Sequence, residues 1–146
     1  MSERFLSKKD IMAIKSGKEK IDFQYFSERS FREYQNDFDL KEDNLRGKKI
    51  LDVGPSFIFQ DEAREKGIDV TAIDPSIRRG VEKGLKFIQG SAQFLPLKDE
   101  SFDLVLANNS VPLHLDKPDE RKDEVGALLS IYEMLRVVKR GGMVKI

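Results

Sequence analysis

Residues 50–54 read Ile-Leu-Asp-Val-Gly, and residues 70–75 read Val-Thr-Ala-Ile-Asp-Pro. Each is a short apolar run with β-branched residues that stops at a glycine or a proline. Similar runs cover residues 85–88, 102–107 and 143–146. The runs are nearly continuous rather than alternating, which is typical of parallel strands that are covered on both faces. The sequence therefore predicts a mostly parallel sheet of about five strands.

Helices are predicted between these strands. Residues 59–66 carry two carboxylates near their start and are followed by Gly67, a frequent helix stop. Residues 118–139 form the strongest helical pattern, with one apolar stripe at Val125, Leu128, Leu129, Tyr132, Leu135 and Val138. Such a stripe is typical of a helix packed against a core, and we expect Gly141 to end this helix. Alternating strands and helices favour an α/β fold, a Rossmann-like three-layer αβα sandwich.

Residues 1–47 differ in character from residues 48–146. They are rich in Lys, Glu, Asp and Phe and contain no strand-like run. A helix is predicted over residues 27–36, with Phe26, Phe31 and Tyr34 as its apolar contacts. We interpret 1–47 as a helical extension and 48–146 as the α/β domain. The extension either only packs on the domain or acts as a lid over a ligand cleft.

The composition excludes several classes of protein. The 146 residues make one domain. No cysteine is present, which excludes a disulfide framework and a thiol nucleophile, and a single histidine excludes a multi-histidine metal centre. Lys and Arg total 26, as do Asp and Glu, so no net field attracts nucleic acid. No apolar run approaches the ~18 residues of a membrane span, and we expect a cytoplasmic protein without a metal.

The candidate site lies where the predicted strands end. In parallel α/β sheets, ligands bind beyond the carboxyl ends of the strands, near the point where the strand order reverses. Gly54 follows the first strand, and Asp74 ends the second strand twenty positions later. A glycine turn lets the backbone approach a ligand, and an acid at the second strand tip accepts hydrogen bonds from ribose hydroxyls. The spacing predicts a nucleoside-binding half-sheet; a turn or capping role before Pro75 is the alternative for Asp74.

Four segments, in order, resemble the motifs of class I S-adenosylmethionine-dependent methyltransferases. They are residues 50–54, residues 70–76, residues 90–97 with 101–105, and residues 133–142. The resemblance spans residues 48–146 and implies S-adenosylmethionine as the cofactor. It implies a first loop around Asp52, Gly54 and Ser56 for the methionine end of the cofactor, and Asp74 for the ribose. It also implies an adenine contact along Ser91 and Ala92, and Asn108 facing the methionine part and the substrate.

The resemblance implies methyl transfer to a small-molecule acceptor that the sequence does not identify. The sulfonium of the cofactor already activates the methyl group, so in-line positioning of the acceptor supplies much of the rate. Some members of the family add a base. His114 follows the fourth predicted strand and is the candidate catalytic base. A loop histidine without a role is the alternative.

The sequence also departs from the family pattern. Ser56 stands where a second glycine is usual, no third glycine follows, and Phe57 and Phe59 lie nearby. Ser91 stands where an acid is common. The chain ends at Ile146, before the C-terminal antiparallel hairpin of the family, which would leave the fifth strand as an edge that can pair with another chain.

These departures favour two further interpretations. One is a non-catalytic methyltransferase-like module that acts in protein interaction. The other is a homodimer formed through the fifth strand or the helix beside it. A nicotinamide-dependent oxidoreductase is disfavoured because the full Gly-x-Gly-x-x-Gly fingerprint is missing. An enzyme remains the favoured interpretation.

Overall fold

The structure is a computed structural model that describes residues 29–75, 84–108, 110 and 124–146. Five parallel strands form one sheet in the order β3-β2-β1-β4-β5. The strands are β1 (Lys49–Val53), β2 (Asp69–Asp74), β3 (Phe87–Gln89), β4 (Phe102–Leu106) and β5 (Val138–Lys145). The α/β class and the parallel sheet predicted from the sequence are therefore confirmed.

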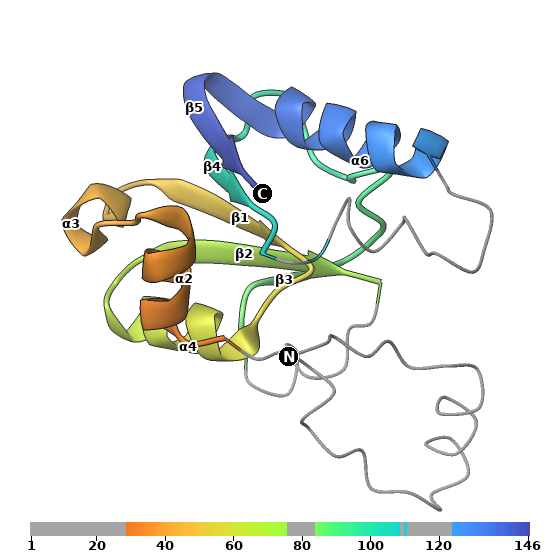
Figure 1. Cartoon of the computed structure of the whole chain (residues 1–146). Helices are drawn as coiled ribbons and strands as arrows, with labels where there is room; N and C mark the ends of the chain where they lie inside the picture. Colours follow the sequence, from red (N-terminus) through yellow and green to blue (C-terminus); the bar gives the residue numbers. More distant parts are fainter. Residues whose placement is uncertain (1–28, 76–83, 109, 111–123) are drawn as a thin grey trace, which may run out of the picture.

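The described helices lie on both faces of the sheet. They are α2 (Phe31–Phe38), α3 (Glu42–Leu45), α4 (Phe57–Glu65) and α6 (Glu124–Val137). Figure 1 shows α6 above the sheet and α2 and α4 below it. The sequence pattern did not predict α3, since four residues are too few to show a helical period.

The central strands β1, β2 and β4 are mostly buried, as the continuous apolar runs predicted, whereas β3 and β5 at the two ends of the sheet are partly exposed. Strand β1 alternates, so that Ile50 and Leu51 point to opposite faces and join different apolar clusters. The cluster on the α2 and α4 side contains Phe31, Tyr34, Leu40, Leu45, Ile50, Phe59, Ala63, Ile68, Val70, Leu104 and Leu106. The cluster on the α6 side contains Leu51, Val53, Ile73, Leu95, Phe102, Val105, Ala107, Met134 and Val137.

Helix α2 begins with a complete capping box. The Ser30 hydroxyl accepts from the Glu33 N–H, and the Glu33 carboxylate accepts from the Ser30 N–H. The helix buries Phe31 and Tyr34 against α4, where both rings stack on Phe59. Two of the aromatic residues predicted as packing contacts of this segment, Phe31 and Tyr34, therefore belong to the same core as β1, and Phe26 lies outside the described residues.

Helix α6 faces the opposite way from the prediction. Val125, Leu128, Tyr132 and Leu135, which form most of the apolar stripe, are 58–69% exposed. The helix instead turns its second face to the sheet, with Gly126, Ser130, Met134 and Val137 buried. Small residues on that face let the helix backbone approach the strands, and the Ser130 hydroxyl donates to the Ala127 carbonyl. Periodicity identified a helix and its stripe but not which face the core would cover.

The junction of α6 and β5 also corrects the prediction. Gly141 does not end the helix: α6 ends at Val137, and β5 begins at the next residue. The pairing with β4 shifts between Phe102, opposite Val138, and Leu104, opposite Met143, so the residues between form a bulge. A Cβ on Gly142 would lie 2.6 Å from the Asp103 carbonyl oxygen. Gly142 therefore serves a close strand contact, and Gly141, with a φ of +77°, supplies a left-handed turn within the bulge rather than a helix stop.

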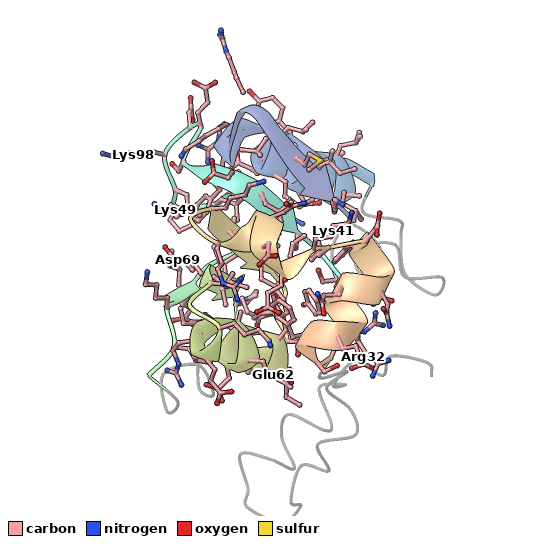
Figure 2. All side chains as sticks on the ribbon, turned by 90° about the vertical axis from the view of Figure 1, so that its left-hand side faces the viewer. Arg32, Lys41, Lys49, Glu62, Asp69 and Lys98 are labelled. Carbon is pink, nitrogen blue, oxygen red and sulfur yellow. The ribbon has the colours of Figure 1, made fainter. Side chains whose placement is uncertain are left out.

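Charged side chains lie around the outside of these layers. Figure 2 labels six of them, of both signs, on several elements: Arg32, Lys41, Lys49, Glu62, Asp69 and Lys98. Among the helices that the structure describes, none is both long enough and apolar enough to cross a membrane.

Candidate functional site

The candidate site lies at the carboxyl ends of β1, β2 and β4. The chain runs from β1 outward to β2 and β3, then returns to β4 and β5 on the other side of β1. The strand order therefore reverses between β1 and β4, where parallel sheets bind ligands. The Gly54 N–H donates to the Ile73 carbonyl at 3.0 Å, which joins the ends of β1 and β2. Asn108 and Ser110 follow β4. Gly54, Asp74 and Asn108, which the sequence singled out separately, therefore lie at one edge of the sheet, where Ser110 joins them.

Asp74 is the last residue of β2 and is only partly buried. Its carbonyl accepts from the Gly90 N–H at 3.2 Å, and Gln89 lies opposite it in register. The Gln89 amide also donates to the Pro75 carbonyl at 3.0 Å. The end of β3 thus supports the turn that carries this carboxylate, in the place where a ribose-binding acid is expected.

Both the backbone conformation and the neighbouring side chains require a glycine at position 54. Its φ is +67°, a left-handed conformation that glycine adopts without strain. A Cβ at this position would lie 2.4 Å from the Ser110 Cβ. The Ser110 hydroxyl donates to the Val53 carbonyl at 2.6 Å and is held over the glycine. The sequence pointed to Gly54 but gave no sign of Ser110, whose partner lies 57 positions earlier.

The loop after β1 lacks the further glycines of the family, and the residues that stand there have no left-handed backbone conformation. Ser56 has φ −96°. Among the described residues, the non-glycine positions with positive φ are Asp39 and Glu100, neither of which lies in this loop. Residues 55–58 therefore keep an ordinary backbone, and the missing glycines cause no strain here. Helix α4 begins at Phe57, directly after Ser56.

Asp52 is completely buried on the α2 and α4 side of the sheet. Its Oδ2 accepts from the Tyr34 hydroxyl at 2.9 Å, and its Oδ1 has no hydrogen-bond partner in the described part of the chain. Burial raises the pKa of Asp52 to about 7, although the Tyr34 hydroxyl and the Ser56 N–H act to lower it. Burial and the neighbouring Asp52 raise the pKa of Tyr34 well above 10, so its hydroxyl stays protonated. The sequence predicted Tyr34 as a packing residue and missed this polar contact.

The raised pKa of Asp52 predicts a pH-dependent stability that an Asp52→Asn variant lacks. Between about pH 4 and pH 7 the folded protein holds a proton on Asp52 that the unfolded chain releases, so the free energy of unfolding falls as the pH rises. We expect the variant to be about as stable as wild type at pH 4. At pH 8 it gains up to roughly 4 kcal/mol over wild type. Urea unfolding at the two pH values measures this, and an equal difference at both would contradict the assignment.

Ser56 joins the loop after β1 to the N-terminal segment. Its hydroxyl accepts from the Arg29 N–H at 2.8 Å and donates to the Arg29 carbonyl at 2.6 Å. The same oxygen caps α4 by accepting from the Phe59 N–H at 3.5 Å. The serine in the place of a glycine therefore binds both backbone groups of one residue 27 positions earlier. The family resemblance implied this serine as part of the loop for the methionine end of the cofactor, and gave no sign of its contacts with Arg29.

Asn108 is also bonded to the N-terminal segment. Its Oδ1 accepts from Arg29 Nη1 at 2.6 Å, and its Nδ2 donates to Asp37 Oδ2 at 2.9 Å. Arg29 and Asp37 form an ion pair at 2.8 Å. These three side chains close a triangle between α2 and the end of β4. The residue predicted to face the methionine part and the substrate is thus 8% exposed and bonded through both ends of its amide.

The predicted adenine loop follows β3. Ser91 is exposed, and Ala92 packs partly buried against the apolar cluster on the α6 side. The Leu95 N–H donates to Glu133 at 2.8 Å, and Arg136 donates to the Leu95 carbonyl at 3.0 Å. The Arg136 guanidinium holds the pKa of the Glu133 carboxyl below its usual value. Helix α6 therefore fixes the far end of the loop and leaves its first residue accessible.

His114, the candidate base, lies outside the described residues. Within residues 29–75, 84–108, 110 and 124–146, no group of three or more His, Cys, Asp or Glu side chains is arranged to hold a metal.

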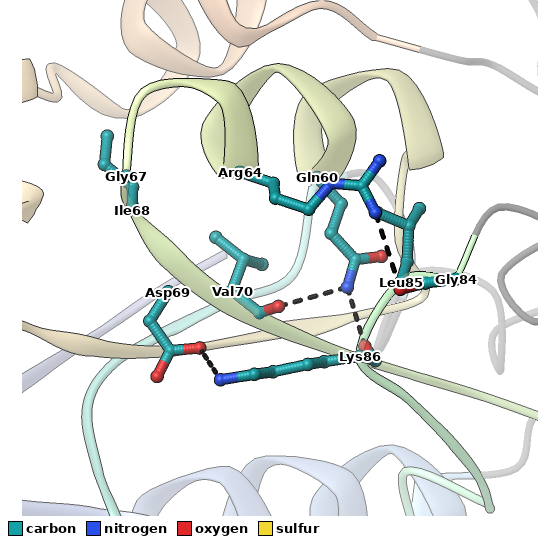
Figure 3. Close-up of a pocket in the computed structure, with 9 residues that line it drawn as sticks. All are labelled: Gln60, Arg64, Gly67, Ile68, Asp69, Val70, Gly84, Leu85 and Lys86. Atoms are coloured by element: carbon teal, nitrogen blue, oxygen red, sulfur yellow. Dashed lines mark hydrogen bonds and ion pairs between the residues drawn. The ribbon is translucent and has the colours of Figure 1, made fainter.

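A groove of about 420 Å³ lies at the other end of the sheet (Figure 3). It runs between α4, the start of β2 and the segment before β3. Gln60 donates from its Nε2 to the carbonyls of Val70 at 3.1 Å and Lys86 at 2.6 Å. The Lys86 carbonyl also accepts from the Ala72 N–H at 3.0 Å, so the buried amide adds a second link between β2 and the segment before β3. This groove is at the amino ends of the strands and holds none of the predicted site residues.

Comparisons with known proteins add to this geometry. Residues 51–146 match the family described as "Methyltransferase domain". No curated protein sequence matches the chain. A solved SAM-dependent methyltransferase of Thermotoga maritima is 20% identical with a TM-score of 0.55, over 91% of this chain and 56% of that one.

Two further solved structures are similar. An S-adenosyl-L-methionine-dependent methyltransferase described from Methanococcus maripaludis is 16% identical with a TM-score of 0.55, over 99% of this chain and 64% of that one. The cyclase SpnF is 26% identical with a TM-score of 0.54, over 78% of this chain and 42% of that one. The chain therefore spans less than two-thirds of the length of each of these structures.

Proposed function

The chain belongs to the methyltransferase domain family, and from that premise we propose that it binds S-adenosylmethionine at the carboxyl ends of β1, β2 and β4. We propose further that it transfers the methyl group to a small-molecule acceptor. Methyl transfer is the chemistry of the family, and S-adenosylmethionine is the cofactor that the family implies. One observation carries the proposal: Asp52, Gly54 and Asp74 converge where the strand order reverses.

The residues present fit this cofactor in two respects. Asp74 offers a partly exposed carboxylate at a strand tip, which can accept from two ribose hydroxyls. Asp52 Oδ1 is a buried acceptor without a partner in the described part of the chain. A buried carboxylate oxygen favours a cationic donor, and the amino group of the methionine part is one.

The chain contributes binding and orientation in this proposal. The bound cofactor supplies an activated methyl group on its sulfonium. Asp74 holds the ribose, Ser91 and Ala92 lie along the adenine, and Asp52 faces the amino group. Asn108, fixed by α2, bounds the methionine end next to the acceptor. In-line positioning of the acceptor supplies much of the rate, and His114 as a base stays a prediction.

Titration with S-adenosylhomocysteine, the demethylated product, tests the proposal. We expect saturable binding with one site per chain by calorimetry. Adenosine and a nicotinamide dinucleotide serve as comparison ligands, since the first lacks the amino-acid end and the second tests the dinucleotide alternative. No heat at millimolar S-adenosylhomocysteine would contradict cofactor binding.

A non-catalytic module is the second candidate, and one observation favours it. The Ser56 hydroxyl, the Asn108 amide and Asp52 Oδ2 already have partners on residues 29–37. The fold alone does not fix the reaction, because a similar solved structure is named a cyclase. Binding of S-adenosylhomocysteine without methyl transfer to any offered acceptor would favour this candidate over the enzyme.

We also propose that two copies associate through β5 or α6. Strand β5 lies at one end of the sheet order, and Met143 on it is 54% exposed. The outward stripe of α6, which includes Leu128 and Tyr132, is exposed beside it. Unpaired edge strands and exposed apolar patches favour association.

Light scattering should therefore give twice the 16.8 kDa mass of one chain. Leu128→Lys should return the chain to a monomer if α6 forms the interface, and Met143→Lys should do so if β5 forms it. A wild-type monomer at high protein concentration would contradict the prediction.

A further inference from the structure

The ring of Tyr34 is held rigidly at the centre of α2. It is 1% exposed and stacks on Phe59 with ring centroids 3.8 Å apart and planes 5° apart. Phe38 packs against its edge at 5.8 Å. Close-packed aromatic rings leave a side chain little freedom, so the position of the Tyr34 hydroxyl is set by the packing of α2 on α4.

That hydroxyl joins two parts of the candidate site. It donates to Asp52 Oδ2 at 2.9 Å and accepts from the Ser56 N–H at 3.3 Å. Since the backbone N–H can only donate, the hydroxyl proton must point to the carboxylate. One atom therefore fixes the orientation of Asp52 and the position of the loop after β1.

The same loop is held a second time through Ser56. Its hydroxyl binds both backbone groups of Arg29, which a glycine could not do. The Arg29 side chain then reaches Asn108, at the end of β4. Residues 29–34 thus contact both strand ends that flank the switch point, although they lie outside the matched residues 51–146.

We propose that Tyr34 is a positioning residue of the cofactor site, which turns the free oxygen of Asp52 toward the amino group of the bound cofactor. In this arrangement residues 29–34, through Tyr34 and the Ser56–Arg29 contact, hold the loop that lacks the further glycines of the family. The inference rests on the proposed function for the identity of the ligand. A purely structural Tyr34 would instead support the fold without any preference for the amino-acid end of a ligand.

The experiment compares Tyr34→Phe with wild type, using two probes. S-adenosylhomocysteine carries the amino-acid end, and 5′-methylthioadenosine lacks it. We expect Tyr34→Phe to weaken the binding of S-adenosylhomocysteine about tenfold at pH 7, as the loss of one hydrogen bond to a charged group predicts. Binding of 5′-methylthioadenosine should stay unchanged. Tyr132→Phe is the matched control, because it removes the same hydroxyl from an exposed position on α6.

Carbon-13 NMR of the Asp52 carboxyl gives a readout that needs no ligand. The Tyr34 hydrogen bond lowers the pKa of Asp52, so Tyr34→Phe should raise it above the wild-type value. The loss of S-adenosylhomocysteine affinity should then shrink at pH 8.5, where more of the carboxyl is ionised. In an Asp52→Asn background, Tyr34→Phe should have little further effect on that affinity.

Two outcomes would overturn the inference: an unchanged Asp52 titration, or equal weakening of both probes. If wild type binds neither probe, the proposed function fails, and the NMR titration still decides whether Tyr34 positions Asp52.

Discussion

Asp74→Ala should abolish cofactor binding while leaving the protein folded. The carboxylate is the proposed acceptor for two ribose hydroxyls, and hydrogen bonds to a charged group contribute about 1.5–3 kcal/mol each. Their loss predicts at least a 100-fold rise in the dissociation constant for S-adenosylhomocysteine by calorimetry. The side chain is only partly buried, so we expect the melting temperature to change little.

Asp69→Ala is the matched control for this prediction. Asp69 begins the same strand that Asp74 ends, and its carboxylate pairs with Lys86 at 2.6 Å on the surface. The control removes a carboxylate from β2 at the end away from the candidate site, so it should bind the probe as wild type does. An Asp74→Ala variant that also binds normally would show that the ribose assignment is wrong.

Gly54→Ala should be the most destabilising single substitution in the loop after β1. A left-handed φ of +67° costs alanine about 1–2 kcal/mol. The new Cβ would also lie 2.4 Å from the Ser110 Cβ, and overpacking of this kind costs a further 1–3 kcal/mol or so. We therefore expect the free energy of unfolding in urea to fall by roughly 2–5 kcal/mol.

Gly67→Ala separates the backbone cost of a positive φ from the cost of overpacking. Gly67 has a similar φ of +74°, but an added Cβ meets nothing within 4 Å, so only the backbone cost of about 1–2 kcal/mol should remain. Ser110→Gly removes the side chain that the new Cβ would meet. In a Ser110→Gly background, Gly54→Ala should therefore lower the free energy of unfolding only by the backbone cost. Equal destabilisation by Gly54→Ala and Gly67→Ala would mean that the contact with Ser110 does not matter.

The raised pKa of Asp52 and its hydrogen bond with Tyr34 could not be predicted from the sequence. Alternation along β1 places Asp52 on the same face as Ile50, which the local pattern already implied. Which side chains cover that face depends on α2, and α2 is separated from β1 in the sequence by α3. The apolar pattern of α2 identified Tyr34 as a packing residue and could not show that its hydroxyl would reach a carboxylate 18 positions later.

The sequence by itself determined the class of fold and pointed to the edge of the sheet at which we propose the site. Continuous apolar runs favour parallel strands, and the turn formers behind them mark the strand ends, because both effects act between residues close together in the chain. Gly54 and Asp74 as candidate site residues follow from that local information, and Asn108 was implied by the family resemblance. The family resemblance on residues 48–146 supplied the cofactor, which the matched family confirms.

Only the tertiary structure decided which of these groups are already bonded and to what. The contacts of Ser56 with Arg29 and of Asn108 with Arg29 and Asp37 join residues that are 27 to 79 positions apart. The tertiary structure also decided which face α6 turns to the sheet, because the exposed stripe on this helix is the more apolar one. Hydrogen bonding and close packing depend on positions in space, and a spacing along the chain fixes those positions only within a single helix or strand.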